Sequence, residues 1–326
     1  MKAWLMNGLR IGLSFGLLAY LIHKADWRSI LAAISRVEGV LFGAALLMFL
    51  AALFLFAVRW RLLLRETNAA IPYPRLVGYY FIGYFFNNFL PTMIGGDVSR
   101  IYFAARDTGE KYVVIATVLM ERILGILATL TLASLSMIWA YPYFNNPWLI
   151  VVTVSLLGLV ALVLLNLLNS TLHRFSLKML QKVTILGIGV KVADLLGKLH
   201  AFRHARRAVL LAYGTSLLCQ LLLILMNFNL AKALGLDTVT FGYLTFLVPV
   251  TFVLGLVPSI NGIGIRDAGY EGLLGAIGVS SAEALSLSFL NTLVPMAMSL
   301  VGGVLLMVYR RRREGAGIEE FRQTIK

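Results

Sequence analysis

The chain has 326 residues, of which 60% are hydrophobic and only 13% are charged, and its mean hydropathy is +0.85. Soluble domains carry about 25% charged residues, so this composition excludes an ordinary water-soluble protein and predicts a chain that lies almost wholly in lipid. The formal net charge is +14, and because the basic residues stand in loops beside apolar runs, it favours contact with anionic headgroups over nucleic-acid binding.

Six apolar runs are long enough to cross a hydrocarbon core of about 30 Å, which takes about 20 helical residues. Two further apolar stretches, 71–106 and 241–281, are interrupted by Pro, Gly and charged residues. Because barrel strands are alternating segments of about 10 residues, the long runs predict an all-α integral membrane protein. The six runs lie near residues 3–22, 39–58, 111–139, 148–168, 208–232 and 283–308.

Loop charge predicts the orientation of these spans, because cytoplasmic loops carry an excess of Lys and Arg. Three basic segments should be cytoplasmic, namely 59–65, 169–207 and the tail 310–313, whereas the uncharged loop 141–147 should be external. These assignments agree only if each interrupted stretch enters and leaves on the same side. We therefore predict two re-entrant helical hairpins, the first opening to the cytoplasm and the second to the exterior, with both termini in the cytoplasm.

The segment 169–207 is the longest one outside the spans. Apolar residues recur in it at helical spacing, and Arg174, Lys178 and Lys182 form a stripe opposite them. This pattern fits an amphipathic helix on the inner headgroups or a plain connecting helix, and neither needs a catalytic role. We therefore treat residues 1–326 as one polytopic membrane domain.

The two interrupted stretches carry similar motifs. Each has a proline, a glycine four residues later, and an Arg and an Asp within ten residues. The units around them, about 39–139 and 208–308, have opposite orientations by loop charge, which is typical of an inverted-repeat transporter. The alternative is a pair of ordinary turns, since Gly-Gly-Asp and Asn-Gly are common turn sequences. The motif residues are Pro91, Gly95, Gly96, Asp97 and Arg100 in the first unit and Pro258, Asn261, Gly262, Gly264, Arg266 and Asp267 in the second.

These motifs predict an anion site near the membrane midplane. A helix that restarts after Gly96 or Gly264 would point N–H groups and its positive dipole end into a shared cavity. Arginine side chains suit a phosphate because their donors form a planar fork. The predicted substrate-binding residues are Arg100, Arg122, Arg266, Asn87, Asn88, Asn261, Gly95, Gly96, Gly262 and Gly264.

Four carboxylates accompany these arginines. Glu121 lies about 15 Å into the span that starts at Lys111, where a charge is costly unless it faces a cavity or a partner. Asp97, Glu121, Asp267 and Glu271 would hold the arginines or carry a coupling proton. The alternative is a set of structural ion pairs. We expect no metal and no cofactor, because the single Cys219 and the four histidines show no ligand spacing.

The motifs together resemble a known family. The ordered set is Asn87-Asn88-Phe-Leu-Pro91, Gly95-Gly96-Asp97-x-x-Arg100, Glu121-Arg122-x-x-Gly125 and Pro258-Ser-x-x-Gly262-x-Gly264-x-Arg266-Asp267. It is similar, over nearly the whole chain, to the transmembrane, flippase-like domain of the lysylphosphatidylglycerol synthase family. The second motif usually has Gly where Asn261 stands and Glu where Asp267 stands, so the choice of lipid can differ.

That resemblance implies movement of a lipid between leaflets, and stand-alone relatives are associated with cell-envelope lipids, hopanoid pathways and lipid-linked glycosylation. We expect no soluble catalytic domain after Arg313, and therefore no aminoacyl transfer. We expect a multi-pass flippase of the cytoplasmic (inner) membrane that is not an enzyme, whose partners are anionic-headgroup lipids and an envelope-lipid or glycolipid biosynthetic enzyme. An intramembrane transferase acting on a lipid-linked substrate and a non-transporting scaffold are the alternatives.

Overall fold

The computed structural model describes residues 19–89, 95–144, 148–169, 171, 174–175, 201–255 and 263–324. Over these ranges every regular element is helical, which confirms the predicted all-α class. Most of the first predicted span, 3–22, and most of the basic segment 169–207 lie outside the described residues, as do both hairpin tips, 90–94 and 256–262.

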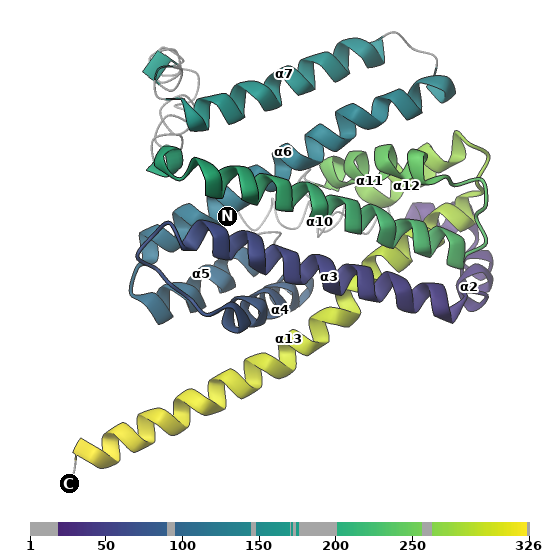
Figure 1. Ribbon diagram of the computed structural model, residues 1–326. Helices are drawn as coiled ribbons and strands as arrows, with labels where there is room; N and C mark the ends of the chain where they lie inside the picture. The colour runs from purple at the N-terminus through teal and green to yellow at the C-terminus, as the bar shows by residue number, and fades with distance from the viewer. Residues whose placement is uncertain are drawn as a thin grey trace, which may run out of the picture.

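Five helices are long and apolar enough to cross a membrane, namely α3, α6, α7, α10 and α13, and they match five of the predicted runs. The run that was expected to end at residue 58 continues as a helix to Leu64, a correction that matters for the site below. The elements are α2 (Trp27–Ser35), α3 (Gly39–Leu64), α4 (Tyr73–Phe89), α5 (Gly95–Thr108), α6 (Lys111–Phe144), α7 (Trp148–Leu168), the 3-10 turn η2 (Ala201–His204), α10 (Arg206–Ala233), α11 (Phe241–Gly255), α12 (Ile265–Gly275) and α13 (Ser281–Thr324) (Figure 1).

Helices α3 and α10 form the central pair of the bundle (Figure 1). They run antiparallel, because the backbone N–H of Glu38, just before α3, donates to the carbonyl of Ala233 at the end of α10 (3.0 Å). Small side chains such as Ala45, Ala52 and Ala212 are fully buried along the two helices. In lipid, small residues favour helix association because they let the backbones approach closely.

Two helical hairpins flank this pair. In the first, Arg75 near the start of α4 pairs with Asp107 near the end of α5 (3.3 Å). In the second, the Tyr243 hydroxyl near the start of α11 donates to the carbonyl of Leu273 near the end of α12 (2.5 Å). The start of α4 therefore lies beside the end of α5, and the start of α11 lies beside the end of α12. With 17, 14, 15 and 11 residues, these helices are shorter than the roughly 20 residues that a full crossing takes.

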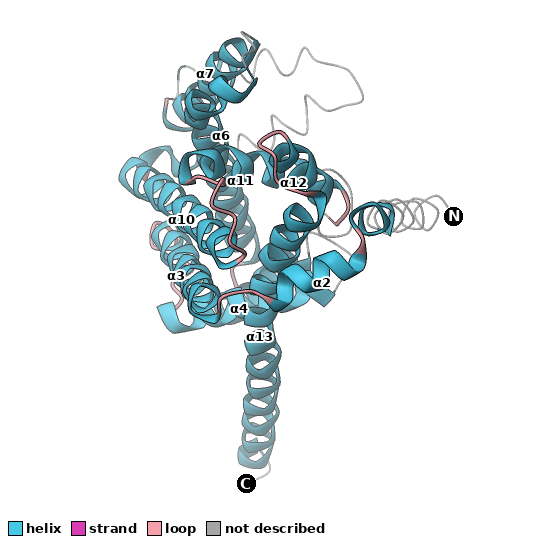
Figure 2. Cartoon of the chain, turned by 90° about the vertical axis from the view of Figure 1, so that its right-hand side faces the viewer, coloured by secondary structure: helices cyan, strands magenta, loops and turns pink. Residues whose placement is uncertain are grey.

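The hairpins open at opposite ends of the bundle. The first opens where α3 ends and α6 begins, and the second where α10 ends and α13 begins (Figure 1). Each packs against a long helix from the other half of the chain, α4 against α13 and α11 against α6. At the first of these crossings Gly302 lies directly on the backbone of Phe81, with no room for a Cβ. Beyond this crossing α13 leaves the bundle (Figure 2).

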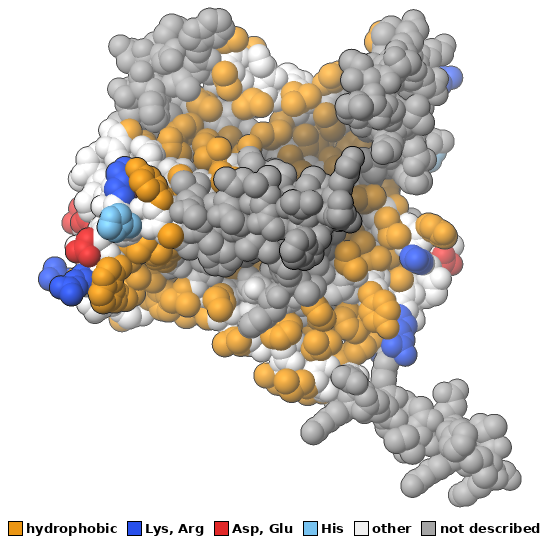
Figure 3. Space-filling view, turned by 180° about the vertical axis from the view of Figure 1, so that it is seen from behind, with side chains coloured by type: hydrophobic (Ala, Val, Ile, Leu, Met, Phe, Trp, Pro, Cys, Tyr) orange, Lys and Arg blue, Asp and Glu red, His pale blue; other side chains and the backbone are white. Residues whose placement is uncertain are grey.

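The outer surface has the distribution expected for a bundle in lipid. One face shows hydrophobic side chains across its middle and charged side chains at two opposite ends (Figure 3). On α7, large apolar residues such as Ile150, Val154 and Leu162 are more than half exposed. An apolar band of this kind needs lipid rather than water as its solvent, so the chain is a multi-pass membrane protein.

Candidate functional site

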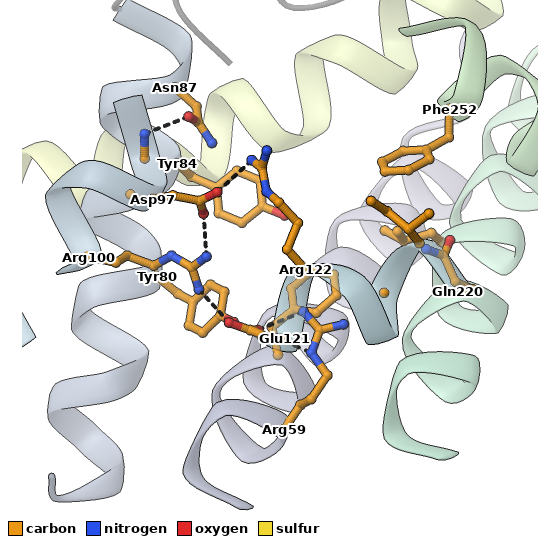
Figure 4. A pocket seen from close by; sticks show the side chains of 16 residues that line it. Arg59, Tyr80, Tyr84, Asn87, Asp97, Arg100, Glu121, Arg122, Gln220 and Phe252 are labelled. Atoms are coloured by element: carbon orange, nitrogen blue, oxygen red, sulfur yellow. Dashed lines mark hydrogen bonds and ion pairs between the residues drawn. The ribbon is translucent and has the colours of Figure 1, made fainter. Parts of the chain in front are cut away.

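Five charged side chains from three helices form an alternating ionic chain inside the bundle (Figure 4). Glu121 on α6 lies between Arg59 on α3 (2.6 Å) and Arg100 on α5 (3.1 Å). Asp97 then joins Arg100 (2.5 Å) to Arg122 on α6 (2.5 Å). Each carboxylate thus uses its two oxygens to hold two different guanidinium groups, an arrangement that only the tertiary fold can assemble.

The inner end of this chain is withdrawn from solvent. The Glu121 side chain is 1% exposed and that of Arg59 is 10% exposed. Glu121 also accepts a hydrogen bond from the Tyr80 hydroxyl, and Arg59 donates to the Ser216 hydroxyl on α10 (3.1 Å). Buried charges are tolerated only when they are paired and hydrogen-bonded, and these contacts meet that condition.

Arg100, in the middle of the chain, is held by aromatic rings as well as by charge. Its guanidinium carbon lies 4.3 Å from the ring centroid of Tyr80 and 5.3 Å from that of Trp60. The Trp60 ring is fixed in turn by its indole N–H, which donates to the Thr117 hydroxyl (3.1 Å). Cation–π contacts strengthen when the cation is desolvated, so the Arg100 side chain is set in one orientation.

The outer end is more accessible. The Asp97 side chain is 15% exposed, and the Arg122 side chain is 45% exposed. Beside them the side-chain amide oxygen of Asn87 (Oδ1) accepts a hydrogen bond from the backbone N–H of Gly96 (2.7 Å). A Cβ on Gly96 would lie 2.6 Å from the Asn87 amide and 2.5 Å from the Gly83 carbonyl, so this close crossing of α4 and α5 requires glycine.

A cavity of about 300 Å³ opens over the ionic chain. Its lining contains all five residues of the chain together with apolar side chains, namely Ile126 from α6, Leu223 from α10 and Phe252 from α11. Gln220 also faces this cavity, where its amide donates to Thr129 (2.7 Å) (Figure 4). With both carboxylates ionised, three guanidiniums against two carboxylates leave one surplus positive charge.

The second motif forms a separate polar cluster. Arg266 lines no part of the cavity, and it donates instead to the Thr292 hydroxyl (2.5 Å). Asp267 accepts hydrogen bonds from the Ser288 hydroxyl (2.6 Å) and from the Gly264 N–H (2.9 Å). That Arg100 and Arg266 share one site therefore stays a prediction, since among the described residues Arg266 contacts α13 rather than the lining of this cavity.

Glu271 also lies away from the cavity. It accepts from Lys24 (2.7 Å) and from the Ser281 hydroxyl (2.8 Å), and so ties α12 to the segment before α2. The predicted helix-end N–H donors are likewise occupied, that of Gly96 by Asn87 and that of Gly264 by Asp267. Charged side chains, rather than these two backbone amides, therefore make up the positive wall.

The remaining predicted residues divide into three groups. Gly95 and Gly96 are buried at the start of α5, and Gly96 lines the cavity together with Asn87. Asn88 does not line it, and its amide nitrogen is buried with no hydrogen-bond partner among the described residues. Asn261 and Gly262 lie outside the described residues.

Arg59 is the main site residue that the sequence interpretation missed. It was assigned to a cytoplasmic basic segment, yet it lies within α3 and is 8% exposed as a whole residue. The available signal was helical spacing, because Arg59 falls on the face that carries the buried Ala52 and Phe56. As for metals, the described ranges hold no group of three or more His, Cys, Asp or Glu side chains that could bind one.

Comparison with known proteins agrees with these features. Residues 8–303 match the family described as the lysylphosphatidylglycerol synthase TM region. The chain is also 26% identical over 317 residues to the UPF0104 membrane protein PH1989 of Pyrococcus horikoshii, covering 89% of this chain and 90% of that protein. Since the match spans most of the chain, this protein belongs to the family of the lysylphosphatidylglycerol synthase TM region.

Proposed function

We propose that this protein moves a lipid with an anionic headgroup from one leaflet of the cytoplasmic membrane to the other, without a chemical step. The headgroup phosphate binds Arg122, at the accessible end of the ionic chain, and the neighbouring Arg100. The observation that carries the proposal is the surplus positive charge of the cavity, which one bound anion would balance. A charge held inside a membrane protein usually marks a substrate or ion pathway.

The mixed lining of the cavity supports a lipid rather than a small ion as the cargo. Ile126, Leu223 and Phe252 add apolar surface to a cavity that the guanidiniums also line. A phospholipid has this same division, with a charged headgroup beside hydrocarbon. Family membership is consistent with a lipid-related role in the membrane.

The helix arrangement supports a transport mechanism. Two hairpins that are too short to cross, that open at opposite ends and that each pack on the other half of the chain fit an inverted repeat with re-entrant hairpins. In such transporters the substrate site lies between the repeats, and the cavity is lined by helices of both halves. Under this proposal the first hairpin opens to the cytoplasm, and both termini are cytoplasmic.

Transport of labelled lipid in proteoliposomes tests the proposal. Wild-type protein should move fluorescent phosphatidylglycerol into the leaflet where dithionite quenches it, and Arg122→Gln should reduce that rate at least tenfold, because a hydrogen bond to a charged group is worth about 1.5–3 kcal/mol. Since the Arg122 side chain is 45% exposed, the variant should still fold.

Arg36→Gln provides the matched control, since it removes an exposed arginine outside the cavity and should leave the rate unchanged. A labelled neutral glycolipid, which has no phosphate, should move much more slowly than phosphatidylglycerol. Equal rates for wild type and Arg122→Gln, or equal rates for both lipids, would refute phosphate binding at this cavity.

A further inference from the structure

A second groove lies at the end of α3, apart from the transport cavity. It has a volume of about 290 Å³ and is lined by Val58, Arg61, Leu62, Arg65 and Tyr73. Val58, Arg61 and Leu62 of α3 and its C-cap residue Arg65 follow the spacing i, i+3, i+4, i+7, so they form one stripe on one face of the helix. Along the stripe the chain passes from Val58, deeper in the span, to Arg65 at its end.

The far wall of this groove is held in place by Tyr73, at the start of α4. Its hydroxyl donates to the backbone carbonyl of Phe54 (3.1 Å), one turn before Val58. The Arg61 guanidinium lies 5.8 Å from the centroid of the Tyr73 ring. The tyrosine ring therefore lies along the stripe, with its position fixed at one end by a hydrogen bond and at the other by a cation–π contact.

The arginines of the groove lack the carboxylate partners that the arginines of the cavity have. Arg59, Arg100 and Arg122 each form an ion pair with a carboxylate, whereas no carboxylate among the described residues pairs with Arg61 or Arg65. Two guanidiniums one helical turn apart are suited to bind the oxygens of one phosphate. The groove is thus complementary to an anion from outside the chain.

We propose that this groove binds the headgroup of an anionic phospholipid of the surrounding membrane, independently of the transport cavity. The phosphate lies between Arg61 and Arg65, and the first part of the acyl chain lies along Val58 and Leu62. A lipid is favoured over a free anion because the groove is at the end of a 26-residue apolar helix, which is the level of the headgroups. Basic pockets between transmembrane helices bind anionic headgroups in this way.

Native mass spectrometry of the purified protein, titrated with short-chain phosphatidylglycerol or phosphatidylcholine, tests the proposal. Wild type should retain phosphatidylglycerol in preference to phosphatidylcholine, with one molecule in the groove and one in the cavity. Arg61→Gln/Arg65→Gln should bind the groove lipid about 25-fold more weakly, since each arginine near a membrane surface raises the affinity for an anionic lipid about fivefold. In proteoliposomes Arg61→Gln/Arg65→Gln should still move labelled phosphatidylglycerol at the wild-type rate, which separates this site from the cavity.

The matched control is Arg206→Gln/Arg207→Gln, which removes two exposed arginines from the start of α10, at the same end of the bundle. An equal loss of lipid binding in this control would mean that any basic residue at this end attracts the lipid, and it would overturn the proposal. Unchanged lipid binding in Arg61→Gln/Arg65→Gln would also overturn it. Competition by inorganic phosphate at comparable concentration would identify a free-anion site instead. The exposed single variant Arg65→Gln gives the same readout if the double variant does not fold.

Discussion

The two hairpins each carry an aspartate at the third position of their second helix, yet the carboxylates of Asp97 and Asp267 make different contacts. Asp267 is 2% exposed, and it reaches back to the N–H of Gly264 to cap α12. In α5 the equivalent task falls to Asn87, which accepts the N–H of Gly96. The carboxylate of Asp97 is therefore available to hold two arginines at the edge of a cavity.

This difference separates the candidate site from a cluster whose partners are structural. Around Asp97 the charges continue from helix to helix and end at a half-exposed arginine. Around Asp267 the partners are mainly hydroxyl and backbone groups, and the neighbouring Tyr270 hydroxyl donates to Asn227 (2.8 Å). Similar motif residues therefore line an accessible cavity in one half of the chain and cap a helix in the other half.

Removing the carboxylate that holds the ionic chain together should have the largest effect on stability. Glu121→Gln leaves Arg59 and Arg100 without their shared partner, and breaking a buried ion pair costs about 3–5 kcal/mol. We expect a clear drop in melting temperature in detergent. Glu110→Gln, at an exposed carboxylate, should leave the melting temperature unchanged, and a Glu121→Gln variant as stable as this control would contradict the assignment.

Asp267→Asn should lower the stability of the protein without abolishing transport. The amide cannot satisfy Gly264, Ser288 and Arg266 together, and an unsatisfied buried polar group costs about 1–3 kcal/mol. Folded Asp267→Asn protein should move labelled lipid at the wild-type rate, whereas Asp97→Asn should change the transport rate with less effect on stability. If the two variants lost transport equally, both hairpins would belong to one site.

The close approach of α4 and α5 makes a glycine substitution informative. Gly96→Ala places a Cβ against the Gly83 carbonyl and the Asn87 amide, and overpacking of this kind costs about 1–3 kcal/mol. Gly272→Ala on α12 has open space around the new Cβ, so it should be tolerated. We expect Gly96→Ala to have a lower melting temperature than Gly272→Ala. Equal melting temperatures of the two variants would contradict the close packing at Gly96.

The smallest effect is expected at the exposed ion pair of Lys232 and Asp237 (2.8 Å). The Lys232 ammonium lowers the pKa of the Asp237 carboxyl. Any stabilisation by this ion pair is therefore fully present when the pH is above the ordinary carboxyl pKa, and it is lost as the pH falls through the lowered pKa. Between about pH 6 and 8 the carboxylate stays ionised. Asp237→Asn should therefore melt like wild type across this window, and a measurable shift there would show that exposure is a poor guide to the strength of an ion pair in this bundle.

Much of the site follows from local sequence patterns. The apolar runs identify the long helices, since lipid requires about 20 consecutive apolar residues. A charge within such a run must have a partner or a cavity, and this reasoning identified Glu121 and Arg122. The motif around Gly96 and Asp97 identified the first hairpin for the same reason, because glycine and charge interrupt a span that would otherwise be apolar.

The pairing of these residues could be decided only by the tertiary structure. Arg59 looked like the first arginine of a basic loop, and it became a buried site residue because α3 continues for one and a half turns and packs against α6 and α10. Arg266 looked like the counterpart of Arg100, but its side chain bonds to α13. Composition and periodicity determine which segments enter the membrane, whereas the partner of a buried charge depends on which helices pack together, and that is set by contacts between residues far apart in the chain.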